Sequence, residues 1–137
     1  MRFLKIFFKA KPKIAERRRS NRVSADDEFR IDFQASASTR MYCIATGKDI
    51  SLTGMRIATF APLQKGEIIE GLLYFNKNFP GLKKMILPMQ VARIYRPFGA
   101  KRYRVGMNFL QSPQYKSELE VVRQFIFWLK TQKKRNF

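Results

Sequence analysis

Residues 29–35 read Phe-Arg-Ile-Asp-Phe-Gln-Ala, with an apolar residue at every second position. Successive side chains of a β-strand point to opposite faces. A period of two therefore predicts a strand with one face in a core and the other in water. Phe29, Ile31 and Phe33 are expected on the buried face. This stretch predicts that the domain is built from half-buried strands.

Five further segments are expected to be strands. They span residues 40–48, 55–60, 67–75, 84–95 and 101–110, with proline, glycine and asparagine between them. These three residue types favour turns. Short strands separated by turns are typical of a closed or partly closed β-barrel, which also removes exposed strand edges. The expected fold class is all-β.

A single helix is expected after the last strand, over residues 113–134. Ser112 suits the N-cap and Pro113 suits the first helical position. Apolar residues then recur at helical spacing, at Leu119, Val122, Phe125, Ile126 and Leu129. This face predicts packing on the barrel or on a partner.

We expect two parts in the chain, a basic arm over residues 1–16 and a barrel domain over residues 17–137 that includes the helix. The arm carries phenylalanines among its lysines. It is interpreted either as a terminus that packs on the domain or as an amphipathic segment that docks on a membrane surface or a partner.

The charge of the chain is strongly one-sided. Among 137 residues there are 28 Lys and Arg against 10 Asp and Glu, which gives a net charge of +18. Such a field attracts nucleic acid, nucleotides, phosphate or an acidic membrane, and it does not distinguish among them. Charge alone therefore predicts an anionic partner and nothing finer.

The composition also disfavours several kinds of site. Histidine is absent and cysteine occurs once, so neither a histidine base nor a zinc cluster is available, and no glycine-rich phosphate loop is present. We expect no enzymatic activity, no catalytic residue and no metal. No apolar stretch approaches the ~20 residues of a membrane-spanning helix. The lone Cys43 fits a reducing compartment, and we expect a cytoplasmic protein.

Four arginines lie just before the first strand, at Arg17, Arg18, Arg19 and Arg22. The planar guanidinium offers a fork of donors that matches a phosphate, or the O6 and N7 edge of guanine. The run is therefore a candidate ligand site, and it also fits a solvated basic linker.

Residues 49–54 read Asp-Ile-Ser-Leu-Thr-Gly. In an extended segment Asp49 and Ser51 share a face. A carboxylate there could accept the two adjacent donors of guanine's Watson–Crick edge. Gly54 would allow a positive backbone angle or the close approach of a ligand. The same residues also suit an ordinary strand–turn–strand corner, in which Asp and Ser bond local backbone groups.

Taken together, Arg18-x-x-x-Arg22 and Asp49-x-Ser-x-x-Gly54 resemble the motifs of the PilZ domain family. The last strand, with Gly106 and Phe109, looks like the Gly-x-x-Phe strand of that family. The resemblance runs from about Arg17 to Leu110 and includes a helix afterwards. It implies a six-stranded antiparallel β-barrel closed by a C-terminal helix. It also implies that the ligand is cyclic di-GMP, a bacterial second messenger.

The resemblance further assigns roles to residues. Arg18 and Arg22 would hold guanines and phosphates, Asp49 and Ser51 would hold a guanine edge, and Gly54 would keep the wall low beneath it. Arg17 and Arg19 lie outside the strict motif and are weaker candidates. Arg56 is near enough to help but has no motif behind it.

We therefore expect a non-enzymatic cyclic di-GMP receptor whose arginine segment becomes ordered on the ligand and presents a new surface to a protein partner or to a second copy of the chain. One bound nucleotide and a stacked pair both remain open. A second interpretation is a sequence-tolerant nucleic-acid binder, favoured by the charge and by four aromatic residues, Tyr95, Phe98, Tyr103 and Trp128. Most of these rings are nevertheless expected in the core. A third interpretation is a PilZ scaffold that binds no nucleotide.

Overall fold

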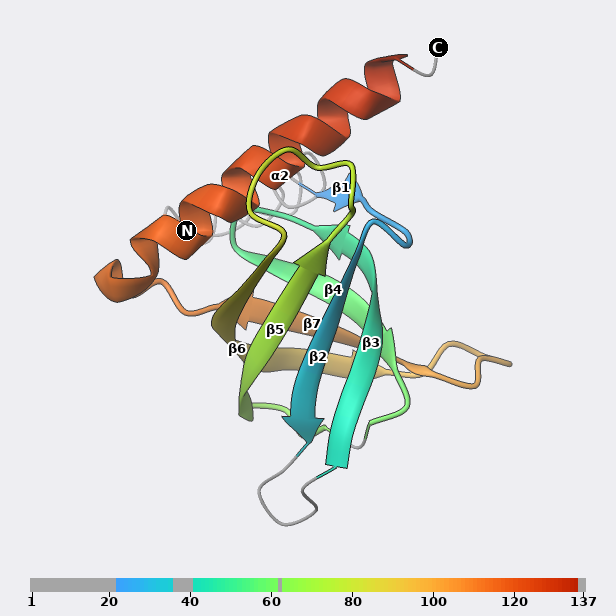
Figure 1. Cartoon of the computed structure of the whole chain (residues 1–137). Helices are drawn as coiled ribbons and strands as arrows, with labels where there is room; N and C mark the ends of the chain where they lie inside the picture. Colours follow the sequence, from blue (N-terminus) through green and yellow to red (C-terminus); the bar gives the residue numbers. More distant parts are fainter. Residues whose placement is uncertain (1–21, 36–40, 62, 136–137) are drawn as a thin grey trace, which may run out of the picture.

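The computed structural model describes residues 22–35, 41–61 and 63–135. Figure 1 shows a barrel of strands with a long helix lying across one end. The strands of this part of the chain are Val23–Ser24 (β1), Phe29–Ala35 (β2), Met41–Ile50 (β3), Gly54–Thr59 (β4), Ile68–Phe75 (β5), Lys84–Tyr95 (β6) and Tyr103–Phe109 (β7). A 3-10 turn, Pro113–Tyr115 (η1), leads into the helix Lys116–Arg135 (α2).

Strands β2 to β7 form a closed antiparallel barrel. The strand order is β1-β3-β2-β5-β6-β7-β4, and a further pairing between β3 and β4 closes the ring. The predicted six-stranded barrel with a C-terminal helix is confirmed. The short strand β1, which pairs with the end of β3, was not predicted, because two residues are too few to show a period.

Alternation along the strands places the core. Phe29, Ile31 and Phe33 are all buried, as the period of two predicts. Near the helix, the ring of Phe125 lies 4.6 Å from that of Phe75 and 5.3 Å from that of Phe79, measured between centroids. Helix α2 thus closes the barrel end with its apolar face, whose fully packed members are Val122, Phe125, Ile126 and Leu129.

The start of the helix differs from the expectation. Ser112 is extended and makes no side-chain capping hydrogen bond, and its carbonyl accepts from the backbone N–H of Tyr115 at 3.0 Å. Pro113 opens the 3-10 turn, and α-helical bonding begins at Lys116. Short 3-10 turns are common at helix N-termini, where the first N–H groups have no helical partner.

Three aromatic side chains that were expected mostly in the core lie on the surface. Tyr95, Phe98 and Tyr103 are exposed, whereas Trp128 is half-buried against Phe125 with ring centroids 5.9 Å apart. These three exposed residues belong to the β6–β7 hairpin and the loop that joins its strands. The hairpin projects beyond the barrel in Figure 1, so the barrel core does not enclose these side chains. Within the described residues, no helix has the length and apolar character needed to cross a membrane.

Candidate functional site

Ser51 holds the turn that joins β3 to β4. Its hydroxyl oxygen accepts from the backbone N–H of Thr53 at 3.3 Å and from that of Gly54 at 3.2 Å. The backbone N–H of Ser51 donates to the Gly54 carbonyl at 2.8 Å. Ser51 is also buried. In this structure its side chain serves the strand–turn–strand corner, and its contact with a ligand stays a prediction.

Gly54 is required by the neighbouring strand. It pairs with Asn108 of β7, and a Cβ at this position would overlap the Met107 carbonyl oxygen and lie 3.2 Å from the Asn108 Cα. Gly54 is not among the described glycines with a positive φ, which are Gly66 and Gly99. The suggested positive backbone angle is therefore wrong, and the close approach that Gly54 allows here is that of β7.

Asp49 is buried and already has a partner. Asp49 lies at the end of β3 and has a relative exposure of 7%. Its carboxylate forms an ion pair with Arg56, the residue opposite it on β4. The other terminal nitrogen of Arg56 donates to the Tyr95 hydroxyl at 3.3 Å. Partial burial lowers the pKa of Arg56, but the Asp49 carboxylate and Tyr95 outweigh it and hold that pKa above its ordinary value. The guanidinium is thus a fixed positive charge beside Asp49.

The strand register extends this pair into a row on the outer wall of the barrel. Asp49 lies opposite Arg56, Arg56 opposite Gly106, and Gly106 opposite Arg93. Residues directly across an antiparallel pair share a face. We call these four residues the outer row. Gly106 leaves bare backbone between two arginines, because the nearest atom that a Cβ there would meet is the Arg93 Cβ at 3.8 Å.

A second basic residue flanks the outer row. Arg104 lies opposite Tyr95 on one side and opposite Ala58 on the other. From the sequence, Arg93 and Arg104 were not predicted to be near the candidate site, and Tyr95 was considered only for nucleic-acid binding, although all three were placed on strands. The alternation of Arg93 with Tyr95 and of Arg104 with Gly106 was visible, but only the pairing register shows that they lie beside Asp49.

Strand β1 brings Arg22 to this place. Val23 pairs with Ile50 and Ser24 pairs with Asp49. Arg22 directly precedes Val23 and is exposed, so it lies next to the end of β3. Arg17, Arg18 and Arg19 lie outside the described residues. The structure therefore brings Arg22 to the segment that holds Asp49, Ser51 and Gly54.

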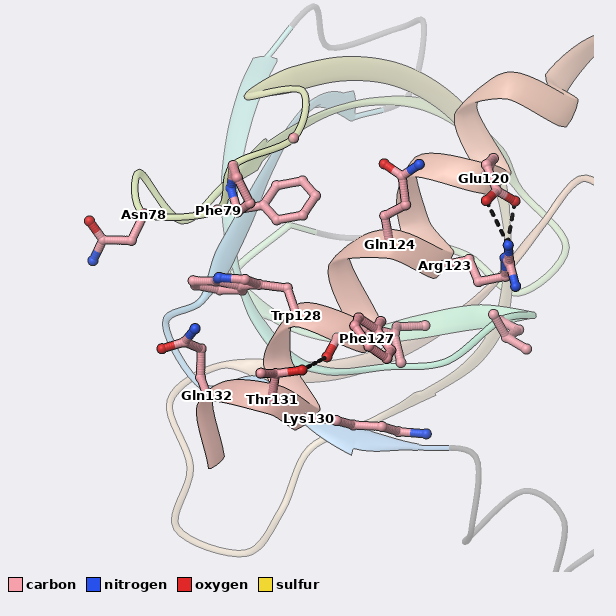
Figure 2. Close-up of a pocket in the computed structure, with 14 residues that line it drawn as sticks. Asn78, Phe79, Glu120, Arg123, Gln124, Phe127, Trp128, Lys130, Thr131 and Gln132 are labelled. Carbon is pink, nitrogen blue, oxygen red and sulfur yellow. Dashed lines mark hydrogen bonds and ion pairs between the residues drawn. The ribbon is translucent and has the colours of Figure 1, made fainter. Parts of the chain in front are cut away.

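A separate groove of about 1120 Å³ runs along α2 (Figure 2). Phe79 and Trp128 line one part of it, and Figure 2 shows Arg123 bound to Glu120 in another part. Hydrogen bonds from Arg123 lower the pKa of Glu120. Among the residues that line the groove, only Leu52 comes from the β3–β4 turn. Of the predicted ligand-binding residues that the structure describes (Arg22, Asp49, Ser51 and Gly54), none lines this groove.

The outer row and the arginines around it suit an anionic ligand that also carries N–H donors. Arginine forks can bind phosphate or the acceptor edge of a base, and a carboxylate can accept from paired N–H groups. Across residues 22–35, 41–61 and 63–135, no cluster of three Cys, Asp or Glu could hold a metal ion. The described side chains of this wall can recognise a ligand by charge and hydrogen bonding.

A family model described as the PilZ domain matches residues 16–128. A sequence search of curated proteins finds no match. Among solved structures, the chain is similar to the PilZ domain with c-di-GMP of YcgR from Escherichia coli. The identity is 18% and the TM-score 0.62, over 84% of this chain and 92% of that one.

Two longer proteins contain a similar fold. The Bacillus subtilis inhibitor of motility MotI/DgrA matches at 13% identity with a TM-score of 0.64, over 82% of this chain and 51% of that one. The K. pneumonia MrkH–c-di-GMP complex matches at 14% identity with a TM-score of 0.68, over 85% of this chain and 53% of that one. The chain thus spans about half of each of these proteins, and at such identities the likeness is one of fold.

Proposed function

This chain belongs to the PilZ domain family, and from that premise we propose that it is a non-enzymatic receptor for cyclic di-GMP, which it binds on the outer wall beside the β3–β4 turn. The observation that carries the proposal is the buried Asp49 carboxylate, held at the barrel surface by Arg56 next to the entry of the arginine segment. The similar YcgR domain is described with c-di-GMP, which supports the same ligand here.

The ligand and the wall are chemically complementary. Cyclic di-GMP carries two guanines, whose N1–H and amino groups are donors, and two phosphates. Asp49 would accept the donor edge of one guanine, while Arg22 and Arg18 would bind guanine acceptor edges and phosphates. Ser51 and Gly54 would shape the turn against which the base lies. Arg17 and Arg19 are weaker candidates for additional contacts.

Arg56 affects how a guanine could bind, because it already forms an ion pair with the Asp49 carboxylate. A guanine that takes the carboxylate must share it with Arg56 or displace the guanidinium. A displaced Arg56 would lie over the bare backbone of Gly106, with Arg93 on the far side. Both arginines would then reach a base face or a phosphate. We propose that the arginine segment orders on the ligand and presents a new surface to a protein partner or to a second copy of the chain.

Calorimetric titration with cyclic di-GMP tests the proposal. Arg22→Ala and Asp49→Ala should each weaken binding by about tenfold or more, because each removes charge-assisted hydrogen bonds. Lys77→Ala, on the exposed β5–β6 loop, is the matched control and should bind as the wild type does. Unchanged affinity in Arg22→Ala or Asp49→Ala would overturn the site. Equal affinity for cyclic di-AMP would overturn the guanine role of Asp49.

A nucleic-acid binder is the alternative, and the exposed Tyr95, Phe98 and Tyr103 beside basic residues favour it. Salt dependence distinguishes the two functions. A protein that covers six to ten phosphates loses roughly 10³–10⁵ in affinity between about 50 and 200 mM salt, whereas a two-phosphate ligand loses far less. A gel shift that persists in the Arg18→Ala/Asp49→Ala variant, without dinucleotide binding by the wild type, would establish the alternative.

A further inference from the structure

The β6–β7 hairpin has an apolar residue at its tip, and all of its charged residues are basic. Residues 90–111 contain no Asp or Glu, and their cations are Arg93, Arg96, Lys101, Arg102 and Arg104. Phe98 stands at the tip with a relative exposure of 109%. The loop projects sideways beyond the barrel and lies clear of helix α2 (Figure 1). The hairpin therefore presents an exposed aromatic ring on a segment whose charged residues are all basic.

The tip has a defined turn. The backbone N–H of Ala100 donates to the Pro97 carbonyl at 2.9 Å, and Gly99 has a φ of +78°. Proline fixes its own φ, and glycine takes the left-handed conformation without strain. Phe98 lies between these two residues, so the turn itself holds the ring outward. A single exposed apolar residue is ordinary on a protein surface, but one presented at the apex of a basic hairpin is a specific arrangement.

We propose that this hairpin docks on an anionic lipid bilayer. Phe98 would enter the boundary between headgroups and acyl chains, and Arg96 and Lys101, which flank the turn, would contact lipid phosphates. Interfacial binding grows with buried apolar area and with attraction between basic residues and anionic lipid. Tyr95 and Tyr103, at the base of the hairpin, suit the headgroup level, where tyrosine is enriched.

The arrangement of the rings favours lipid over single-stranded nucleic acid. Binding by stacking needs several ring faces open to successive bases. The Arg96 guanidinium already lies over the Tyr103 ring, 5.6 Å from its centroid. The Tyr95 hydroxyl accepts from Arg56. Phe98 remains as one ring on a convex apex, which can insert into an interface but offers successive bases no groove.

Vesicle sedimentation with the full chain and no cyclic di-GMP tests this proposal separately from the receptor function. The wild type should pellet with vesicles of phosphatidylcholine and phosphatidylglycerol, and not with phosphatidylcholine alone. Phe98→Ala should lower the partition coefficient by about tenfold, from the lost apolar burial. Arg96→Glu/Lys101→Glu should lower it by about 25-fold or more, since each basic residue near an anionic surface contributes about fivefold.

Two matched controls separate the hairpin from general exposure and charge. Phe127→Ala removes an exposed ring from α2, and Lys77→Glu/Lys116→Glu reverses two exposed charges outside the hairpin. The Phe127 variant should leave the partition coefficient unchanged, and the double reversal should lower it far less than reversal in the hairpin does. Equal losses from the two double reversals would overturn the proposal, because bulk charge would then explain the binding.

A direct probe of insertion is Phe98→Trp, read against the wild type, whose single native tryptophan is half-buried Trp128. Its additional emission should shift to shorter wavelength on anionic vesicles and stay unshifted with single-stranded DNA. No shift on vesicles, or wild-type vesicle binding by Phe98→Ala, would overturn the proposal. So would hairpin variants that lose retardation of single-stranded DNA while keeping their vesicle binding.

Discussion

Arg56 is ion-paired with Asp49 across the β3–β4 pair, and this places a guanidinium beside the carboxylate that we propose accepts a guanine edge. The Asp49 side chain is 10% exposed and that of Arg56 is 38% exposed. The pair is therefore buried on one side and open to water on the other.

A double-mutant cycle should detect this pair in the stability of the ligand-free protein. Asp49→Ala, Arg56→Ala and the double variant, unfolded in urea, should give a coupling free energy of about 1 kcal/mol, reduced from that of a buried pair because Arg56 is partly solvated. Arg123→Ala and Glu120→Ala form a control cycle on the surface of α2, where the coupling should be smaller. A coupling free energy between Asp49 and Arg56 no larger than that of the control pair would contradict a stabilising role of this ion pair.

Ser51→Ala should destabilise the barrel by about 1–2 kcal/mol, because the buried N–H group of Gly54 and the partly buried N–H group of Thr53 lose their acceptor. Chemical denaturation measures this directly. Thr53→Ala, at an exposed position of the same turn, should cost clearly less. If Ser51→Ala were as stable as the wild type while binding cyclic di-GMP more weakly, the serine would serve the ligand rather than the turn.

The two glycines of adjacent strands, Gly54 and Gly106, should differ in how much stability their replacement by alanine costs. Gly54→Ala places a Cβ onto the backbone of Met107 and should cost about 3 kcal/mol or more, because the backbone of β7 would have to move. Gly106→Ala has room and should cost less than about 1 kcal/mol. It would, however, place a methyl group between Arg56 and Arg93, and titration should show weaker binding of cyclic di-GMP. Wild-type affinity in Gly106→Ala would remove the outer row from the binding surface.

Asp32 is a candidate for stabilisation by substitution. It is 6% exposed, lies opposite Ile44 and Leu72 on neighbouring strands, and its Oδ1 has no hydrogen-bond partner among the described residues. Arg30 lies at ion-pair distance, with Nε 3.4 Å from that oxygen, but without a hydrogen bond. Asp32→Val should raise the free energy of unfolding by about 1 kcal/mol, since burial of an incompletely satisfied charge is costly.

The control for Asp32 is Glu70→Val, at an exposed position of β5. It gives the gain expected from β-propensity alone, and Asp32→Val should exceed it in thermal or urea unfolding. A loss of stability in Asp32→Val would mean that the ion pair with Arg30 compensates for the burial of the carboxylate.

The sequence by itself predicted the six barrel strands, the C-terminal helix and the order of the two motifs. These are local properties. The period of two in residues 29–35 and the helical spacing of Val122, Phe125 and Leu129 depend on neighbours along the chain, and they persist whichever partner each strand finds. The spacing of Arg18 with Arg22, and of Asp49 with Gly54, is equally local. A motif comparison can therefore detect it without any structure.

Tertiary structure alone decided which residues meet. Three findings depend on pairing between strands that are distant in the sequence. They are the ion pair of Arg56 with Asp49, the position of Gly106 between two arginines, and the lack of room for a side chain at Gly54 beside β7. A shift of register by one residue would reverse the face of every side chain. The surface position of Phe98 likewise follows from how far the β6–β7 hairpin extends past the barrel. Periodicity shows which residues alternate along a strand, but it does not show where a strand leaves the packed core.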